Sequence, residues 1–146
     1  MILLDTNVVS EPMKLGGGDP LVSGWLNAQA PGTLCLSTIT VAELLYGVAI
    51  LPAGIRRERL HRRLTVEVLP VFSDRIFGFD YAAAATNSEL RARAKARGRP
   101  IPDSDGFIAA IALSRGFALA TRNTRHFEGV GLELINPWLG RSDIPA

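Results

Sequence analysis

The sequence predicts an α/β protein in which a parallel sheet lies between helices. Short apolar segments bounded by polar or turn residues alternate with longer segments whose apolar residues recur at helical spacing. The first apolar segment, residues 2–4, runs directly into Asp5, as expected of a buried parallel strand ending at the carboxyl edge of a sheet. Because strands alternate with helices, we expect helices on both faces of the sheet.

The composition is that of one globular domain. Of the 146 residues, 47% are hydrophobic and 21% are charged, and the net charge is +2. This length supports a hydrophobic core, and we expect a single domain at residues 1–138 with a short tail at 139–146. The single cysteine, Cys35, excludes an intrachain disulfide. Since neither a signal-like N-terminus nor an apolar run of about 20 residues is present, we expect a cytoplasmic protein with no membrane partner.

The N-terminal half is predicted to alternate strands with helices. Asp19 and Pro20 form an N-cap and first helical turn, and Pro31 ends that helix. The helix after the second strand is apolar on every side, so we expect it to be buried. The elements in order are a strand at 2–4, a broken segment at 8–14, a helix at 20–29, a strand at 34–36 and helices at 38–51 and 54–65.

The C-terminal half is predicted to hold three more strands and two helices. Asp80 caps the first of these helices and Gly98 ends it. The second is apolar on every side, hence central, and by spacing Asp103 is a better cap for it than Asp105. The elements in order are a strand within 66–72, a connection at 73–78, helices at 81–97 and 106–114, and strands at 117–120 and 132–135.

Acidic and amide side chains are predicted to meet at the carboxyl edge of the sheet, where open α/β proteins bind ligands. Asp5 and Asn123 follow strands, Glu43 lies on the helix expected to be buried, and Asp105 stands at a helix start. Each position has a simpler interpretation by itself. Asp5 could cap the next helix, Glu43 could form a capping box with Thr40, and Asn123 could belong to a turn.

If the three carboxylates converge, their charges must be compensated. Two unit charges about 4 Å apart repel by roughly 4 kcal/mol at an effective dielectric of about 20. The site must therefore protonate, pair with a cationic side chain such as Arg122, or bind a metal ion. Oxygen ligands with no cysteine and no nearby histidine favour Mg²⁺ or Mn²⁺ over zinc.

Basic residues gather on two predicted helices. Residues 56–63 hold six potential cations and one acid, Glu58, and a second basic patch spans residues 91–99. Such a segment attracts a polyanion or an acidic partner, although a solvated helix face has the same pattern. Beside a metal-binding acidic pocket, these patches point to phosphodiester hydrolysis, in which the metal polarises the phosphate and activates water.

Five segments of the chain carry a family resemblance: MILLDTNVVSEP, STITVAELLYGVA, DSDGFIAAIA, LATRNTRHF and INPW. In this order they resemble the PIN-domain toxins of the VapC type, from type II toxin–antitoxin modules, and most of all the branch that includes the FitB-like proteins. The resemblance covers nearly the whole chain, from Met1 to about Trp138. It implies a five-stranded parallel sheet between helices.

The resemblance also implies a set of site residues. Asp5, Glu43 and Asp105 would be the catalytic acids around Mg²⁺ or Mn²⁺, and Asp105 is chosen over Asp103 because the family aspartate precedes the GFIAA stretch. Asn123 stands where close relatives carry a fourth aspartate, so it would be a secondary or water-mediated ligand and leaves one charge fewer for a second metal ion. The supporting residues would be Thr6, Asn7 and Thr121.

The activity implied by the resemblance is cleavage of structured RNA by a toxin that a VapB-like antitoxin neutralises. The toxin would form a homodimer and would bind operator DNA only through the antitoxin. The residues assigned to RNA or antitoxin binding are Arg56, Arg59, Arg63 and Arg122. The alternative is a weakly catalytic or non-catalytic partner of the antitoxin in a DNA-binding autoregulatory complex, and the asparagine at position 123 keeps it open.

Overall fold

The protein was analysed as a computed structural model, which describes residues 1–140. Within that range the strands form one parallel sheet with the order β3-β2-β1-β4-β5. Its strands are β1 (Ile2–Leu4), β2 (Leu34–Ser37), β3 (Ile76–Phe77), β4 (Ala118–Ala120) and β5 (Leu134–Ile135). The predicted fold class is confirmed. Most of the tail expected at 139–146 lies outside the described residues.

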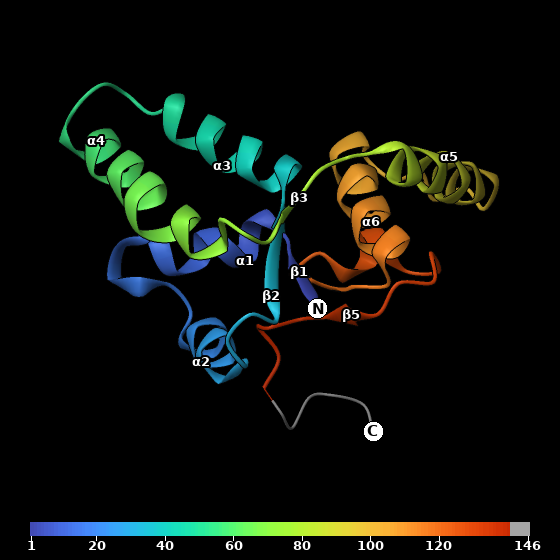
Figure 1. The fold of residues 1–146 in the computed structure, drawn as a ribbon, viewed down its shortest axis with the longest axis horizontal. Coiled ribbons are helices and arrows are strands. Elements are labelled where there is room, and N and C mark those ends of the chain that lie inside the picture. The colour runs from blue at the N-terminus through green and yellow to red at the C-terminus, as the bar shows by residue number, and fades with distance from the viewer. Residues whose placement is uncertain (141–146) are drawn as a thin grey trace.

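Helices cover both faces of this sheet (Figure 1). One face carries α1 (Thr6–Ser10), α2 (Pro20–Ala28), α3 (Thr38–Ala49) and α4 (Ile55–Arg62). The other face carries α5 (Tyr81–Ala96) and α6 (Asp103–Arg115). Short 3₁₀ turns named η1 (Glu11–Met13) and η2 (Leu15–Gly17) follow α1, and η5 (Thr124–Phe127) follows β4.

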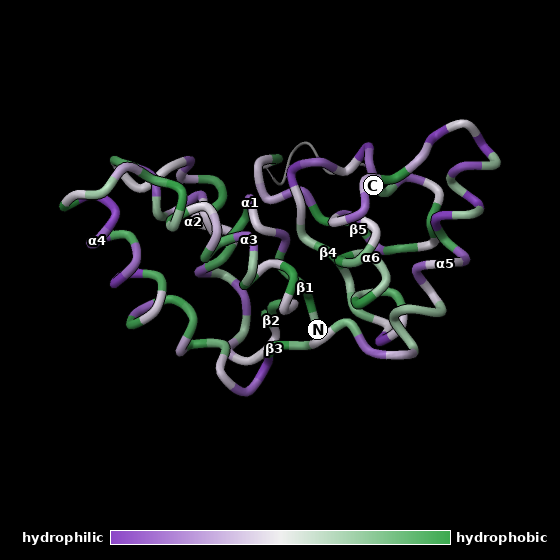
Figure 2. Tube along the Cα trace, turned by 90° about the horizontal axis from the view of Figure 1, so that it is seen from above, coloured by the Kyte–Doolittle hydropathy of each residue, from purple (hydrophilic) through white to green (hydrophobic). Residues whose placement is uncertain are grey.

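Successive residues of β1 supply the two halves of the core. Leu3 packs with α5 and α6, whereas Leu4 packs with α1, α3 and the neighbouring helices, and both side chains are buried. This alternation is the period-2 geometry of a strand. Figure 2 shows the hydrophobic residues concentrated in the central strands and the hydrophilic ones on α4 and α5. The sheet thus lies between the two halves of the apolar core.

The order in which successive strands join the sheet reverses between β1 and β4. From the central β1 the chain passes to β2 and β3 on one side, then returns to β4 and β5 on the other. In such sheets the crevice at this switch point is the ordinary ligand site. The segments that follow β1 and β4 are Asp5-Thr6-Asn7 and Thr121-Arg122-Asn123.

The strand predicted within residues 66–72 is wrong. That stretch continues α4 as a π-helical turn (Arg63–Val68) and a 3₁₀ turn (Leu69–Phe72), and β3 lies in the predicted connection instead. A short apolar run does not by itself distinguish a strand from a helical turn, and Pro70 has no N–H to give to a sheet. The last strand is also shorter than predicted, and α6 begins at Asp103, not at 106.

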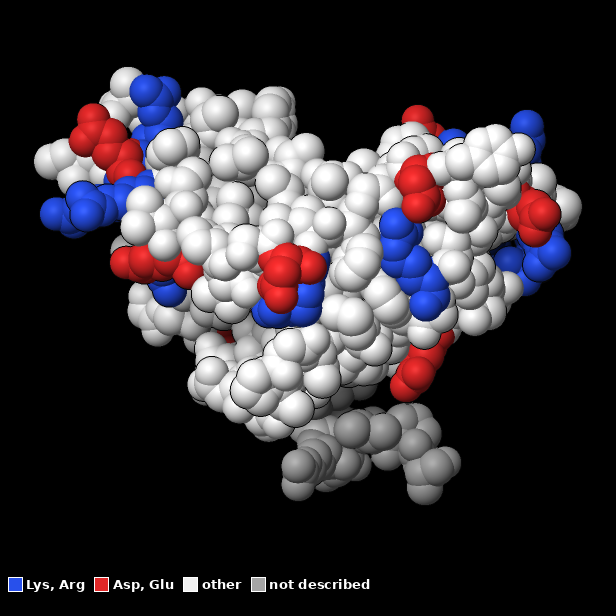
Figure 3. All heavy atoms as spheres, in the orientation of Figure 1, with Lys and Arg blue, Asp and Glu red and all other residues white. Residues whose placement is uncertain are grey.

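The expectation that the helix after β2 is buried on every side is also wrong. Leu44 and Val48 of α3 face the core, but Leu45, Tyr46 and Ile50 are 36%, 66% and 62% exposed. One stripe of α3 meets the α1 side of the core and Ile39 packs on the α6 side, whereas Tyr46 and Ile50 stay largely uncovered by residues 1–140. Figure 3 shows a broad uncharged surface over α3, between the charges on α4 and those on α5. No helix in the described part of the chain has the length and hydrophobicity to cross a membrane.

Candidate active site

Asp5 lies at the switch point of the sheet, directly after β1. Its backbone N–H donates to the Ala120 carbonyl at 2.9 Å, which ties the ends of β1 and β4 together. Its Oδ1 accepts from the Thr6 N–H at 2.8 Å, and its Oδ2 accepts from the Thr121 hydroxyl at 2.7 Å. Asp5 therefore does cap α1, as its simpler interpretation proposed, and it also presents a carboxylate at the crevice.

Burial and neighbouring acids act together on Asp5. The residue is only 5% exposed. Burial raises the pKa of its carboxyl above the ordinary value; the hydrogen bonds from Thr121 and Thr6 oppose this, and the charges of Asp105 and Glu43 add to it. The three predicted acids are thus close enough to interact electrostatically. A cation in their midst would relieve the mutual repulsion.

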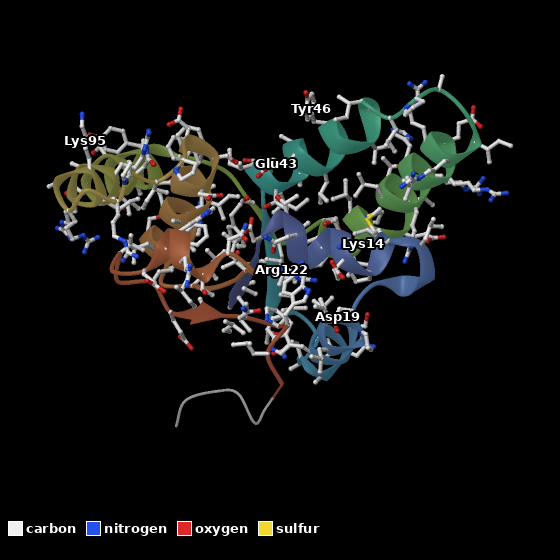
Figure 4. All side chains as sticks on the ribbon, turned by 180° about the vertical axis from the view of Figure 1, so that it is seen from behind. Lys14, Asp19, Glu43, Tyr46, Lys95 and Arg122 are labelled. Carbon is white, nitrogen blue, oxygen red and sulfur yellow. The ribbon has the colours of Figure 1, made fainter. Side chains whose placement is uncertain are left out.

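Glu43 reaches the site from the first half of α3. Its Oε1 accepts from the Thr6 hydroxyl at 3.1 Å and from the Ser104 hydroxyl at 3.0 Å. Figure 4 shows Glu43 where α3 meets α1 and α6, with Tyr46 pointing outward from the same helix. The capping-box interpretation is wrong, because α3 is capped by Ser37, whose hydroxyl accepts from the Thr40 N–H.

Asp105 stands in the first turn of α6, and its Oδ2 lies 2.6 Å from His126 Nδ1. Asp103 pairs instead with Arg91 of α5. The prediction that Asp103 caps α6 is wrong: Pro102 occupies the N-cap position and no side chain caps the helix. The carboxylate of Asp103 is therefore engaged with α5, and that of Asp105 with the turn after β4.

Thr121 and Asn7 support the ends of the two central strands. The Asn7 amide donates weakly to Asp5 Oδ2 at 3.4 Å and accepts from the Arg122 N–H at 3.2 Å. Thr121 is fully buried and also accepts from the Asn123 N–H at 3.0 Å. The backbone of Asn123 takes part in this turn, and the residue is exposed to solvent. All the hydrogen bonds that Asn123 makes among residues 1–140 come from its backbone.

The suggestion that Arg122 neutralises the acids is wrong. Its guanidinium lies 5.2 Å from the centroid of the Trp138 ring, and its charge acts on Glu11, not on Asp5. Among residues 1–140, the basic side chain that contacts one of the three acids is His126. The expectation of no histidine near the acids is therefore wrong as well. His126 is distant from the acids in the sequence, and the turn of the chain after β4 brings it back to α6.

Two residues of the site were missed from the sequence, Ser104 and His126. Ser104 immediately precedes Asp105 in the sequence. Its closeness to the site could therefore have been predicted once Asp105 was chosen. His126 lies 21 positions beyond Asp105 along the chain. Only the return of the chain from β4 to the start of α6 brings the two together.

A groove made of two adjoining cavities lies between Glu43 and the basic helix α4. A cavity of about 350 Å³ is lined by Thr6, Glu43 and Arg56, with Leu44, Val48 and Leu60 among its apolar residues. A second cavity of about 660 Å³ continues past Lys14 to Arg59 and Arg63. Among residues 1–140, no arginine of α4 forms an ion pair with a carboxylate.

Fold and site together define an open α/β protein with an acidic centre at the switch point of its sheet. The sequence profile of the PIN domain matches residues 2–131. The chain belongs to the PIN-domain family.

Relatives within the family cover almost the whole chain. VapC ribonuclease Y4jK of Sinorhizobium fredii is 49% identical over 138 residues, which are 94% of this chain and 98% of the relative. Toxin FitB of Neisseria gonorrhoeae is 43% identical, over 94% of this chain and 99% of the relative. The solved structure of FitAB bound to an IR36 DNA fragment matches with a TM-score of 0.91 and 41% identity, over 95% of this chain and 96% of the other.

Proposed function

We propose that this protein is the toxin of a type II toxin–antitoxin module and acts as a metal-dependent endoribonuclease. The observation that carries the proposal is the convergence of three acids at the switch point of a PIN-domain sheet: Thr6 donates to both Asp5 and Glu43, and Ser104, which adjoins Asp105, also donates to Glu43. Its support from relatives is the name VapC ribonuclease given to a protein 49% identical to this one. Residues 1–138 would form the single catalytic domain, and the protein would act in the cytoplasm, where its RNA substrate lies.

The donor set suits a hard divalent cation. Among residues 1–140, no three Asp, Glu, His or Cys side chains already surround one point as metal ligands would. The acids nevertheless offer only oxygen atoms, and the pKa of Asp5 is raised partly by its two acidic neighbours. Oxygen donors favour Mg²⁺, with Mn²⁺ as a substitute. Asp5, Glu43 and Asp105 would hold the ion, with Asn123 as a secondary or water-mediated ligand.

When bound, such an ion supplies charge stabilisation at the phosphate and a lowered pKa for an attacking water. The chain supplies the positions. The Thr6 N–H donates to one oxygen of Asp5, and the Thr6 hydroxyl donates to one oxygen of Glu43. The Thr121 hydroxyl donates to the other oxygen of Asp5. These supports keep the carboxylates directed at the crevice without neutralising them.

The groove toward α4 would bind the RNA backbone or the antitoxin. Arg56, Arg59 and Arg63 line it without carboxylate partners among residues 1–140, which leaves their charges available for phosphates. Arg122 would act at the other side of the site. We propose a VapB-like antitoxin as the partner, a homodimer of the toxin, and operator DNA bound only through the antitoxin. The structural match to FitAB bound to DNA supports this assembly.

Replacement of Asp5 tests the proposed activity. Asp5→Asn should abolish growth inhibition and reduce cleavage of total RNA in Mg²⁺ by at least about a hundredfold, because it removes one of three ligand charges. Excess EDTA should do the same to the wild type, and Asp19→Asn, at an aspartate that caps α2, should leave cleavage unchanged. Cleavage that persists in EDTA or in Asp5→Asn would contradict the proposal.

The second candidate function is that of a weakly catalytic or non-catalytic partner in a DNA-binding complex. Asn123 favours it, because the position lacks a charge and its side chain bonds to no acid among residues 1–140. Asn123→Asp separates the two functions. If the protein is an enzyme, this variant should bind Mn²⁺ more tightly in calorimetry and cleave RNA at least as fast. A wild type and a variant that both leave RNA intact, while the complex with antitoxin binds operator DNA, would favour the second function.

A further inference from the structure

His126 makes a direct contact with one acid of the site. Its Nδ1 lies 2.6 Å from Asp105 Oδ2, with the carboxylate side chain 20% exposed and the imidazole 46% exposed. An ionised carboxylate can only accept hydrogen bonds. Nδ1 must therefore carry the hydrogen of this contact, which leaves Nε2 on the far side of the ring from Asp105.

The position of His126 is set by the end of β4. The neighbouring Phe127 is 1% exposed and anchors η5 in the core between the sheet and α6. The His126 N–H donates to the Asn123 carbonyl at 3.1 Å, and the Asn123 N–H donates in turn to the Thr121 hydroxyl at 3.0 Å. Since Thr121 donates to Asp5, one chain of hydrogen bonds places His126 relative to the central carboxylate.

The hydrogen bonds of Glu43 and Asp105 share one arrangement. Oε1 of Glu43 accepts from Thr6 and Ser104, and Oδ2 of Asp105 faces His126. Among residues 1–140, the second oxygen of each carboxylate, Oε2 and Oδ1, accepts no hydrogen bond. Each acid thus has one oxygen held by a neighbour and one left for a ligand.

We propose that His126 is a positioning residue for metal binding: its Nδ1–H holds Oδ2 of Asp105 so that Oδ1 serves as the ligand atom. This inference rests on the proposed function, because it concerns the metal that the endoribonuclease uses. A partner that orients a ligating carboxylate contributes typically tenfold to a hundredfold to metal affinity. Ser104 and Thr6 do the same for Glu43, but with neutral hydroxyl groups.

A different role for His126 makes the opposite prediction. If the imidazole merely compensated the charge of Asp105, it would compete with the metal for that carboxylate. Its removal would then strengthen metal binding. The sign of the change in affinity therefore separates positioning from charge compensation.

The test measures Mn²⁺ binding to the full chain by calorimetry or electron paramagnetic resonance. His126→Ala should weaken binding about tenfold. His126→Asn, whose amide nitrogen can take the place of Nδ1 as donor, should restore it to within about threefold. His61→Ala is the matched control, because His61 is the other histidine of the chain and lies on exposed α4. It should leave the affinity unchanged.

A second readout needs no metal. In ¹⁵N spectra of the metal-free protein, with His61→Ala used to assign the two histidines, the Nδ1 of His126 should carry a proton. A bare Nδ1 would overturn the proposal, and so would unchanged or tighter Mn²⁺ binding by His126→Ala, or a wild type that binds no Mn²⁺. RNA cleavage by the wild type with unaltered metal binding in His126→Ala would refute the positioning role alone. Weakened binding in a protein that cleaves no RNA would refute the proposed activity alone.

Discussion

At the scale of single residues, Asp5 serves two purposes at once. It caps α1 through the Thr6 N–H, and it is a nearly buried acid whose neighbours include two further acids. A helix cap needs only an acceptor oxygen, and asparagine supplies one as well as aspartate does. The negative charge therefore contributes nothing that the cap requires, and burial makes it costly.

The pH dependence of stability should reveal this cost. The folded-state pKa of Asp5 is raised above the ordinary value of 3.8, chiefly by burial. The folded state therefore binds the proton more tightly, and the stabilisation from protonated Asp5 is complete below pH 3.8 and is lost as the pH rises through the raised pKa. Asp5→Asn should raise the thermal midpoint at pH 7 by a few degrees. The gain should shrink toward pH 3.5, as thermal unfolding in the two buffers would show.

Asp19→Asn serves as the control for this comparison. Asp19 caps α2 by accepting from the Leu21 N–H at 2.9 Å, so its replacement preserves a cap without relieving a buried acidic cluster. Its thermal midpoint should match the wild type at pH 7. A lower midpoint for Asp5→Asn at pH 7 would mean that the carboxylate stabilises the fold, contrary to the burial argument.

At the scale of elements, an ion pair between buried Glu11 and exposed Lys14 shapes the turn between α1 and α2. Glu11 is 6% exposed, its carboxylate lies 2.6 Å from Lys14 Nζ, and it accepts from the Asp19 N–H at 3.0 Å. The hydrogen bond from Lys14 is the main cause that lowers the pKa of Glu11. Gly18 closes this turn against Glu11 with a φ of +70°. The turn forms one wall of the groove beside α4.

Gly18→Ala should therefore destabilise the protein. A Cβ at this position would lie 2.2 Å from the Glu11 carbonyl oxygen, and the positive φ is unfavourable for alanine. We expect a loss of about 1–3 kcal/mol in the free energy of unfolding, measured by urea denaturation. Gly24→Ala, in the middle of α2 with nothing within 4 Å of the new Cβ, should instead stabilise by about 0.5–1 kcal/mol. Equal effects at the two glycines would refute the steric explanation.

The basic helix α4 should determine the salt dependence of RNA binding. Each cation that contacts a phosphate of single-stranded RNA adds about 0.7 to the slope of log affinity against log salt. The combined replacement of Arg56, Arg59 and Arg63 by glutamine should therefore reduce the slope by about 2. Gel-shift titrations with catalytically inactive Asp5→Asn protein would measure it.

A matched triple replacement on α5 tests whether RNA binds in the groove beside α4 or at the other basic patch. Arg93, Lys95 and Arg99 lie at or just past the end of α5, and Arg93 and Arg99 have carboxylate neighbours. Their replacement by glutamine should change the slope by less than the α4 triple. A larger effect on α5 would place the RNA there and return α4 to the interpretation of a solvated face.

At the scale of the whole molecule, the exposed apolar stripe of α3 is a surface suited to self-association. Tyr46 of α3 and Ile50 at its C-terminal end are 66% and 62% exposed, and Figure 3 shows an uncharged surface over α3. Exposed apolar patches of this kind mark interfaces. Ile50→Glu should shift the protein toward monomer in light scattering. Val71→Glu, at another exposed apolar residue that is 61% exposed, should not, and equal behaviour of the two variants would exclude α3 as the interface.

Local patterns in the sequence were sufficient for most of the fold. The alternation of short apolar runs with amphipathic helices predicted the parallel sheet, and the polar residues after residue 4 and residue 120 predicted its functional edge. The prediction was wrong at residues 66–72, where an apolar run containing Pro70 forms helical turns. The places of Glu43 and Asp105 on predicted helices suggested them as companions of Asp5, and the resemblance to VapC-type toxins then favoured Asp105 over Asp103.

Local sequence patterns were enough to predict most of the strands and helices and the acids near their ends, because these features depend on residues near one another in the chain. The contacts between distant segments became known from the three-dimensional structure. It placed His126 on Asp105, Ser104 and Thr6 on Glu43, and Arg122 over Trp138, and it left one stripe of α3 uncovered. Such contacts depend on how β1, β4 and α6 come together across the switch point. The spacing of residues along the chain does not show which of these segments lie close together in space.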